Sequence, residues 1–242
     1  MKVFIEKNYD QLSKRAADMI AGEISKNPKA VLCLPTGSTP IGTYRELSGM
    51  YAAGKVDFSG IVTFNLDEYI GLRQDDENSY HYFMHHHLFD HINIKQENVY
   101  VPDGLSENME EACKNYDAKL DIYKEKDLLL TGIGQNGHIG FNEPDDRLFA
   151  RTHTVSLSEN TRAANSRLFK NADDVPKAAI TMGVADIMHF KKMIIIANGT
   201  AKAAIIKDLL TGRMIDTHNT SSLTYLHNDV TVILDEEAAS LL

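Results

Sequence analysis

The sequence predicts an α/β protein with a mostly parallel sheet and helices on both faces of that sheet. Three observations support this prediction. Short apolar runs recur along the whole chain, several of these runs are almost continuous in Val, Ile and Leu, and amphipathic stretches lie between most of them. Strands buried on both faces have this continuous apolar character. Their alternation with helices is typical of parallel sheets.

The apolar runs and the stretches between them place the elements in chain order. Strands are expected at residues 3–5, 30–34, 61–66, 98–101, 127–133, 152–157, 193–197 and 230–234. Helices are expected at residues 11–26, 43–53, 106–123 and 202–210, with a final turn from Glu236. Because no internal repeat, low-complexity tract or linker interrupts the series, we expect a single domain over residues 1–242.

The composition narrows the class of protein. The 242 residues are 43% hydrophobic and 24% charged, which is ordinary for a globular chain. A net charge of −9 argues against binding to nucleic acid, although a local basic pocket could still hold an anion. Cys33 and Cys113 have no CxxC neighbour, so neither a disulfide framework nor a zinc knuckle is expected. With no signal peptide and no apolar run near the roughly 20 residues of a membrane span, a cytoplasmic protein is expected.

A glycine-rich segment follows the apolar run that ends at Ile133. It reads GIGQNGHIGFNEP over residues 132–144 and brings Asn136, His138 and Glu143 together. Glycines allow positive φ angles and close approach to a ligand. An imidazole beside a carboxylate can transfer protons near neutral pH. Since ligands of parallel α/β folds bind at the carboxyl ends of the strands, this segment is the first candidate for an active site.

Two more polar clusters follow strand ends. The first is Thr36, Gly37, Ser38 and Thr39, with Pro40 behind them. A Gly-Ser/Thr loop that opens a helix can bind a phosphate, with Thr39 as N-cap and Pro40 at the first helical position, although a merely well-capped helix start is the alternative. The loop lacks the Gly-Lys-Ser/Thr tail of a Walker A motif, so a sugar phosphate is favoured over a nucleotide.

The second cluster is the carboxylate pair Asp67 and Glu68. Either carboxylate could serve as a general base, ligate a metal or lie in a solvated turn. Adjacent strand residues point to opposite faces, so only one of the two is expected to enter a site.

Two further motifs point to functions that we consider and reject. Residues 132–137 spell GxGxxG, but the following residues are poor in helix formers and end at Pro144, so dinucleotide binding is not expected. Five histidines gather between residues 81 and 91, with helical i,i+4 pairs at His81/His85 and His87/His91. The pairs face different sides of the helix and lack the carboxylate of an HExxH motif, so solvated or core-edge histidines are expected and no metal site is assigned.

Positive charge that could meet a phosphate occurs in two places. TRAANSR at residues 161–167 carries Arg162 and Arg167, and a Gly-Thr turn precedes Lys202. An Arg and a Lys aimed at one phosphate are ordinary recognition chemistry. Exposed surface charges are the alternative for each of them.

Taken together, the motifs resemble the glucosamine-6-phosphate deaminase family. The segments that carry the resemblance occur in the same order over nearly the whole chain: LPTGSTP at 34–40, NLDEY at 65–69, GIGQNGHIGFNEP at 132–144, TRAANSR at 161–167 and PKAAITMG at 176–183. The resemblance implies a Rossmann-like fold. It also implies conversion of glucosamine 6-phosphate and water to fructose 6-phosphate and ammonia in amino-sugar catabolism, without metal or organic cofactor. Apart from the resemblance, we expect the stretch near residues 145–172 to form a mobile lid that carries Arg167.

The resemblance also implies a role for each matching residue. Asp67 would remove the proton from C2 of the sugar. His138 would open the pyranose ring, oriented by Glu143 with Asn136 beside it. The phosphate would be held by Thr36, Gly37, Ser38, Thr39, Arg167 and Lys202.

The chain departs from the family pattern at two places. Many members carry Asp at the position of Asn136, and Asn cannot hold a negative charge, so the carboxylate that orients His138 should be Glu143. The longer, allosterically regulated members carry Ser, Arg and Lys at the positions of Arg147, His153 and Val155 and extend beyond Leu242. We therefore expect no activation by N-acetylglucosamine 6-phosphate and a monomer or small homo-oligomer.

Other functions remain open at this point. A 6-phosphogluconolactonase or a ribose-5-phosphate isomerase would share the architecture, but a lactonase gives Asp67 no role. A sugar-phosphate-sensing module would keep the phosphate loop and lose one of the acid–base residues. Because Asp67, His138 and Glu143 are all present, an enzyme is favoured.

Overall fold

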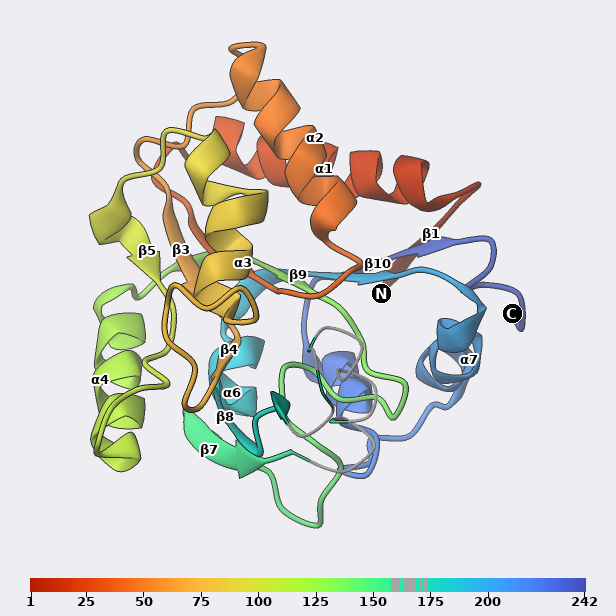
Figure 1. Cartoon of the computed structure of the whole chain (residues 1–242). Coiled ribbons are helices and arrows are strands. Elements are labelled where there is room, and N and C mark those ends of the chain that lie inside the picture. Colours follow the sequence, from red (N-terminus) through yellow and green to blue (C-terminus); the bar gives the residue numbers. More distant parts are fainter. Residues whose placement is uncertain (158–161, 163–168, 170, 172–173) are drawn as a thin grey trace.

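A seven-stranded parallel sheet forms the centre of the molecule (Figure 1). The computed structural model describes residues 1–157, 162, 169, 171 and 174–242. In spatial order the strands of the sheet are β1 (Lys2–Glu6), β10 (Val230–Asp235), β9 (Phe190–Ala197), β6 (Lys126–Thr131), β2 (Val31–Leu34), β3 (Val62–Asn65) and β5 (Val99–Tyr100). All neighbouring pairs in this sheet are parallel, which confirms the predicted fold class.

Helices cover both faces of this sheet (Figure 1). One face carries α1 (Tyr9–Lys26), α2 (Ile41–Ala52) and α3 (Tyr80–His87), and the other carries α4 (Met109–Ile122), α6 (Val184–Met188) and α7 (Ala203–Thr211). Short 3₁₀ turns complete the described elements: η1 (Phe89–His91), η2 (Gln96–Asn98), η5 (Thr200–Lys202) and η6 (Thr220–Leu226). In the described part of the chain, no helix is both long and apolar enough to cross a membrane.

Strand alternation divides the buried side chains into two cores. Leu32 and Leu34 of β2 pack with α1 and α2 on one face of the sheet. Cys33, between them, packs on the opposite face with residues of α4 and α7. Successive strand side chains point to opposite faces, so a strand that is apolar at every position fills both cores. This explains why the predicted strands read as continuous apolar runs.

The strand order reverses between β2 and β6. From β2 the chain proceeds outward through β3 and β5, and from β6 it proceeds outward in the other direction through β9 and β10. The loops that leave the carboxyl ends of β2 and β6 therefore diverge. Open parallel sheets bind their ligands in the crevice at such a reversal.

A small antiparallel sheet lies beside the large one and corrects two predictions. It contains β4 (Asp67–Tyr69), β8 (Ala178–Thr181) and β7 (His153–Ser156), in that order. The run at 152–157 is a strand, as predicted, but belongs to this sheet rather than to the parallel one. β4 and β8 were not expected, because both are short and β4 begins with two acidic residues that disfavour strands.

Candidate active site

Three loops meet at the carboxyl edge of the large sheet. They follow β2, β6 and β9. The Thr39 hydroxyl donates a hydrogen bond of 2.7 Å to Asn198 Oδ1, which joins the loop after β2 to the loop after β9. Lys202 Nζ donates to the Ile133 carbonyl over 2.5 Å, which joins the loop after β9 to the loop after β6. The predicted phosphate loop, Lys202 and the glycine-rich segment are thus joined to one another by hydrogen bonds at this edge of the sheet.

The glycine-rich loop is shaped around His138. The backbone N–H of Gly134 donates to the His138 carbonyl over 2.9 Å, so the loop turns back on itself. A Cβ atom on Gly134 would lie 2.5 Å from the imidazole, so the ring would have to move away from its present position. Gly137 has φ = +87°, a region that favours glycine. Both glycines are needed for His138 to take this position.

His138, Glu143 and Asn136 form a connected group. His138 Nδ1 lies 3.3 Å from Glu143 Oε1, and both side chains are mostly buried. Asn136 donates from Nδ2 to the other carboxylate oxygen of Glu143 over 2.6 Å and accepts the His138 backbone N–H at its own oxygen over 3.3 Å. The neutral amide of Asn136 therefore fixes the carboxylate, and the carboxylate faces the imidazole. This group can hold a proton on His138 and release it.

Asp67 occupies β4 and is 8% exposed. It pairs with Thr181 of β8, and the Thr181 hydroxyl accepts the backbone N–H of Phe141 over 3.1 Å. A Cβ atom on Gly140 would lie 3.5 Å from Asp67 Oδ2. The glycine-rich loop therefore packs directly against Asp67. Burial, followed by the charge of neighbouring Glu68, raises the pKa of Asp67 to about 8.

Glu68 has a structural role at the start of α3. Its carboxylate accepts the backbone N–H groups of Tyr69 over 2.8 Å and of Tyr80 and His81 over 2.9 Å each. Tyr80 and His81 form the first turn of α3, where backbone donors have no partner inside the helix. Burial raises the pKa of Glu68 to about 7, and the three N–H donors oppose that shift. The two adjacent carboxylates thus have different surroundings.

The loop after β2 differs in one detail from the prediction. α2 begins at Ile41 with Pro40 as its N-cap, one residue later than expected, and no side chain caps it. The Thr39 hydroxyl, expected as that cap, is instead bonded to Asn198. Gly37 has φ = +100°, and Ser38 is exposed at the tip of the loop. Thr36 is half-buried beside it.

The two predicted cations have different outcomes. Lys202 ends the 3₁₀ turn η5 and points to the carboxyl end of β6, where it bonds the Ile133 carbonyl. Arg167 lies outside the residues that the structure describes, as does much of the expected lid at 145–172. Of the two cations that the resemblance assigns to the phosphate, only Lys202 lies among the described residues.

The histidine cluster keeps one of its two predicted helical pairs. His81 and His85 both lie in α3, with ring centroids 4.6 Å apart. His87 and His91 do not share a helix. α3 ends at His87, and His91 belongs to η1, because Leu88 between them leaves the helical conformation at φ = −141°. His85 Nδ1 lies 2.8 Å from Asp90 Oδ1. Among the residues that the structure describes, no group of three or more His, Cys, Asp or Glu side chains could hold a metal ion.

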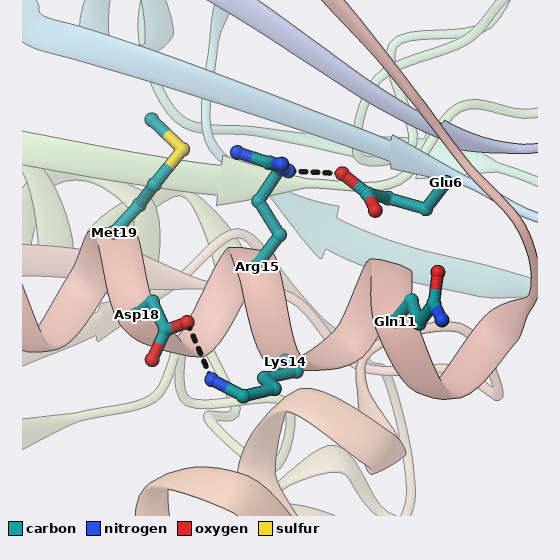
Figure 2. A pocket seen from close by; sticks show the side chains of 6 residues that line it. All are labelled: Glu6, Gln11, Lys14, Arg15, Asp18 and Met19. Atoms are coloured by element: carbon teal, nitrogen blue, oxygen red, sulfur yellow. Dashed lines mark hydrogen bonds and ion pairs between the residues drawn. The ribbon is translucent and has the colours of Figure 1, made fainter.

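An open hollow of about 340 Å³ lies between β1 and α1, lined by residues with no part in the predicted site (Figure 2). Its charged groups pair with each other. Arg15 bonds Glu6, and Lys14 Nζ lies 2.8 Å from Asp18. Arg15 also lies 4.4 Å above the ring of Phe4. The contacts of Arg15 fasten α1 to β1, whereas the Lys14–Asp18 pair lies within α1. We assign the hollow no function.

Sequence reasoning missed three residues that support the site. Asn198, Thr181 and Thr220 each bond one of its loops. Asn198 directly follows the predicted strand at 193–197, so its place at a strand end was a usable signal. Thr181 lies in the segment 176–183 that contributes to the family resemblance. Nothing in the sequence around Thr220 connects it to the glycine-rich loop.

The fold and the site define an α/β protein with acid–base residues at the reversal point of a parallel sheet. A family model described as glucosamine-6-phosphate isomerases/6-phosphogluconolactonase matches residues 6–222, and the chain belongs to this family. A protein of Thermoanaerobacter sp. (strain X514) is 50% identical over 242 residues, covering 100% of this chain and 95% of that protein. One of Clostridium perfringens (strain ATCC 13124) is 48% identical and covers both chains fully. Both relatives are named glucosamine-6-phosphate deaminase.

Solved structures give the same result. A monomeric glucosamine-6-phosphate deaminase superposes with a TM-score of 0.97 at 44% identity, over 100% of both chains. The 6-phosphogluconolactonase of Thermotoga maritima superposes with a TM-score of 0.74, over 97% of this chain and 98% of that one. Its identity is only 18%, so this second likeness concerns the fold alone.

Proposed function

We propose that this protein is a glucosamine-6-phosphate deaminase, which converts glucosamine 6-phosphate and water to fructose 6-phosphate and ammonia in amino-sugar catabolism. The observation that carries the proposal is that the loop with the His138–Glu143 pair packs against the buried carboxyl of Asp67 in β4. The reaction needs proton transfers at two places on the sugar, the ring and C2. The site offers a separate group for each.

His138 is assigned to ring opening. The cyclic sugar has no carbonyl, so a proton must leave the C1 hydroxyl and another must reach the ring oxygen. Imidazole does both near neutral pH. Glu143, held by Asn136, orients the ring through the 3.3 Å contact at Nδ1 and stabilises the imidazolium that forms.

Asp67 is assigned to C2. The open aldehyde makes the C2 proton acidic, and the carboxylate takes it to give an enolamine. Returning a proton to C1 gives a ketimine, which water hydrolyses with loss of ammonia. A carboxylate whose pKa burial has raised to about 8 is a stronger base than an exposed one. These steps use protons and water only, so no metal or cofactor is part of the proposal.

The phosphate is assigned to Thr36, Gly37, Ser38, Thr39, Lys202 and Arg167. The first four form the loop at the reversal point of the sheet, and Lys202 is bonded to the neighbouring loop. A phosphate held there would fix C1 and C2 against the acid–base groups, and such positioning contributes to rate.

The domain organisation, location, assembly and regulation of the protein are also proposed. We propose a single domain over residues 1–242, a cytoplasmic location and a monomer or small homo-oligomer, the last supported by the monomeric deaminase that superposes on this chain. Light scattering on the purified protein tests the assembly. His153 stacks on Phe149 at 4.4 Å and, with Arg147 and Val155, replaces the residues of the regulated members. We therefore expect hyperbolic kinetics that N-acetylglucosamine 6-phosphate leaves unchanged.

The function is tested by following ammonia and fructose 6-phosphate in parallel, with glucosamine 6-phosphate as substrate and a metal chelator present. Equal formation of both products is the expected result. Hydrolysis of 6-phosphogluconolactone without ammonia release would establish the lactonase instead. Thermal stabilisation by the sugar phosphate without any turnover would indicate a sensing module.

A further inference from the structure

We infer that Thr220 is a positioning residue that sets the geometry of the His138–Glu143 pair. The inference rests on the proposed function, because that function gives the pair its task. Thr220 begins η6, is 2% exposed and lies far along the chain from the glycine-rich loop.

The Thr220 hydroxyl contacts the glycine-rich segment at two places, beside His138 and beside Glu143. Thr220 Oγ1 lies 3.0 Å from the Gly137 carbonyl oxygen and 3.0 Å from the Asn142 carbonyl oxygen. Gly137 directly precedes His138, and Asn142 directly precedes Glu143. The single hydroxyl hydrogen is therefore shared between the two carbonyls, in a bifurcated bond that ties together the backbone points from which the imidazole and the carboxylate extend.

The residues next to Thr220 in sequence contact Gly137, the first of these two points. The backbone N–H of Ser221 also donates to the Gly137 carbonyl, over 2.7 Å. Asn219 Oδ1 occupies the space where a Cβ of Gly137 would stand, at 2.2 Å, and accepts the Ser221 hydroxyl over 2.6 Å. Gly137 thus keeps other contacts when the Thr220 hydroxyl is lost. The Asn142 side chain also keeps its bonds from Nδ2 to the Ile139 and Met182 carbonyls. We therefore expect the loss to fall on the Asn142 backbone carbonyl and, through it, on Glu143.

The pair is sensitive to such a shift. His138 Nδ1 is buried, and among the described residues no acceptor is aligned with it for a hydrogen bond. Its contact with Glu143 is the 3.3 Å approach to Oε1. If the Glu143 backbone moves, the carboxylate no longer orients the imidazole, and ring opening slows. Small misplacements of acid–base groups reduce rates strongly even when binding is intact.

The first test compares three variants. Thr220→Val removes the hydroxyl and keeps the shape, Thr220→Ser keeps the hydroxyl, and Thr224→Val is the matched control. Thr224 lies in the same η6, is 1% exposed and donates its hydroxyl hydrogen to the Ser221 carbonyl over 2.6 Å rather than to a carbonyl of the glycine-rich loop. We expect kcat of Thr220→Val to fall about tenfold. KM should stay within about twofold, since the phosphate contacts are intact.

Thr220→Ser should keep most of the wild-type kcat. Thr224→Val should keep the wild-type kcat even though it loses as much thermal stability as Thr220→Val. Equal kcat in Thr220→Val and Thr224→Val would overturn the inference. If the Val variant does not fold, Thr220→Ala removes the same hydroxyl without the branched side chain, and the same comparison applies.

A second readout is independent of the reaction. Nitrogen NMR of the His138 imidazole reports whether Nδ1 faces the carboxylate. Thr220→Val should move this signal toward that of Glu143→Gln, and Thr224→Val should leave it unchanged. If the wild-type protein releases no ammonia, the proposed function fails, and this spectrum still decides whether Thr220 positions the pair. An unchanged His138 signal in Thr220→Val would refute that role.

Discussion

The two acid–base centres of the site are built in opposite ways. Asp67 lies in a regular strand of the small antiparallel sheet, where β8 pairs with it residue by residue. His138 lies in an irregular loop that leaves the large parallel sheet. Glycines allow this loop to pack closely, and side chains from distant segments bond to it. Asp67 owes its proposed reactivity to burial, and His138 owes it to the neighbouring carboxylate.

This difference separates two kinds of sensitivity. On the Asp67 side the backbone is fixed by strand pairing, so replacing the carboxyl group by an amide should abolish the chemistry and leave the fold intact. On the His138 side the backbone depends on close approach, so adding volume nearby should be as harmful as changing the histidine. Substitutions on each side test this contrast.

Asp67→Asn should lower kcat by about three orders of magnitude, because an amide cannot accept the C2 proton. Substrate affinity should change little, as measured by calorimetry with glucosamine 6-phosphate. Glu68→Gln is the matched control at the adjacent carboxylate. Glu68→Gln should lower the free energy of unfolding by about 1–3 kcal/mol, because it weakens the hydrogen bonds from the N–H groups at the start of α3. It should retain more activity than Asp67→Asn. The reverse ranking of the two kcat values would exchange the assigned roles.

His138→Gln should lower kcat by about a hundredfold, since ring opening then proceeds without its acid–base group. The loss should be greatest on the cyclic sugar. An open-chain analogue that needs no ring opening should react at close to the wild-type rate. An equal loss on both substrates would remove His138 from ring opening.

Gly134→Ala should lower kcat by about tenfold, because the added Cβ would stand 2.5 Å from the imidazole and displace it. Gly132→Ala is the control in the same loop, where a Cβ meets nothing within 4 Å. The circular-dichroism spectra of both variants should match the wild type. If Gly132→Ala is the more damaging substitution, close approach at Gly134 does not control His138.

The pH dependence of stability should differ between Asp67→Asn and the wild type. Burial raises the pKa of Asp67 to about 8, so the folded protein keeps a proton that the unfolded chain releases near pH 4. The free energy of unfolding contributed by this group therefore falls as pH rises through that window. The amide in Asp67→Asn does not titrate, so the variant does not lose this stability as pH rises. The melting temperature of Asp67→Asn minus that of the wild type should therefore increase between pH 5 and pH 8.

Calorimetric melting curves at several pH values measure this difference. A change of 1 kcal/mol corresponds to about 2–4 °C in a chain of this size. A difference in melting temperature that is constant with pH would show that Asp67 titrates like an exposed carboxyl.

The two sheets also differ in how far the sequence predicted them. Strands of the parallel sheet, such as Val31–Leu34, are apolar at every position because both faces are buried, and this pattern is visible in sequence. β4 carries Asp67 and Glu68, which local propensity reads as a turn. Its strand conformation comes from pairing with β8, a contact between segments far apart in the chain.

The site divides in the same way. Gly134, His138 and Glu143 are close in sequence, so their common turn could be predicted. The 2.7 Å bond between Thr39 and Asn198, and the reach of Thr220 to Gly137, depend on how distant loops meet at one edge of the sheet. Local patterns therefore identified the reacting groups, and tertiary contacts determine how these groups are held.

Exchange of the C2 proton tests the central assignment most directly. Glucosamine 6-phosphate is incubated in heavy water with wild-type protein, Asp67→Asn or His138→Gln, and its C2 proton is followed by NMR. We predict that the wild type removes the C2 signal, that His138→Gln removes it slowly, and that Asp67→Asn leaves it at the rate without enzyme. Loss of the C2 signal in Asp67→Asn at the wild-type rate would contradict the role of Asp67.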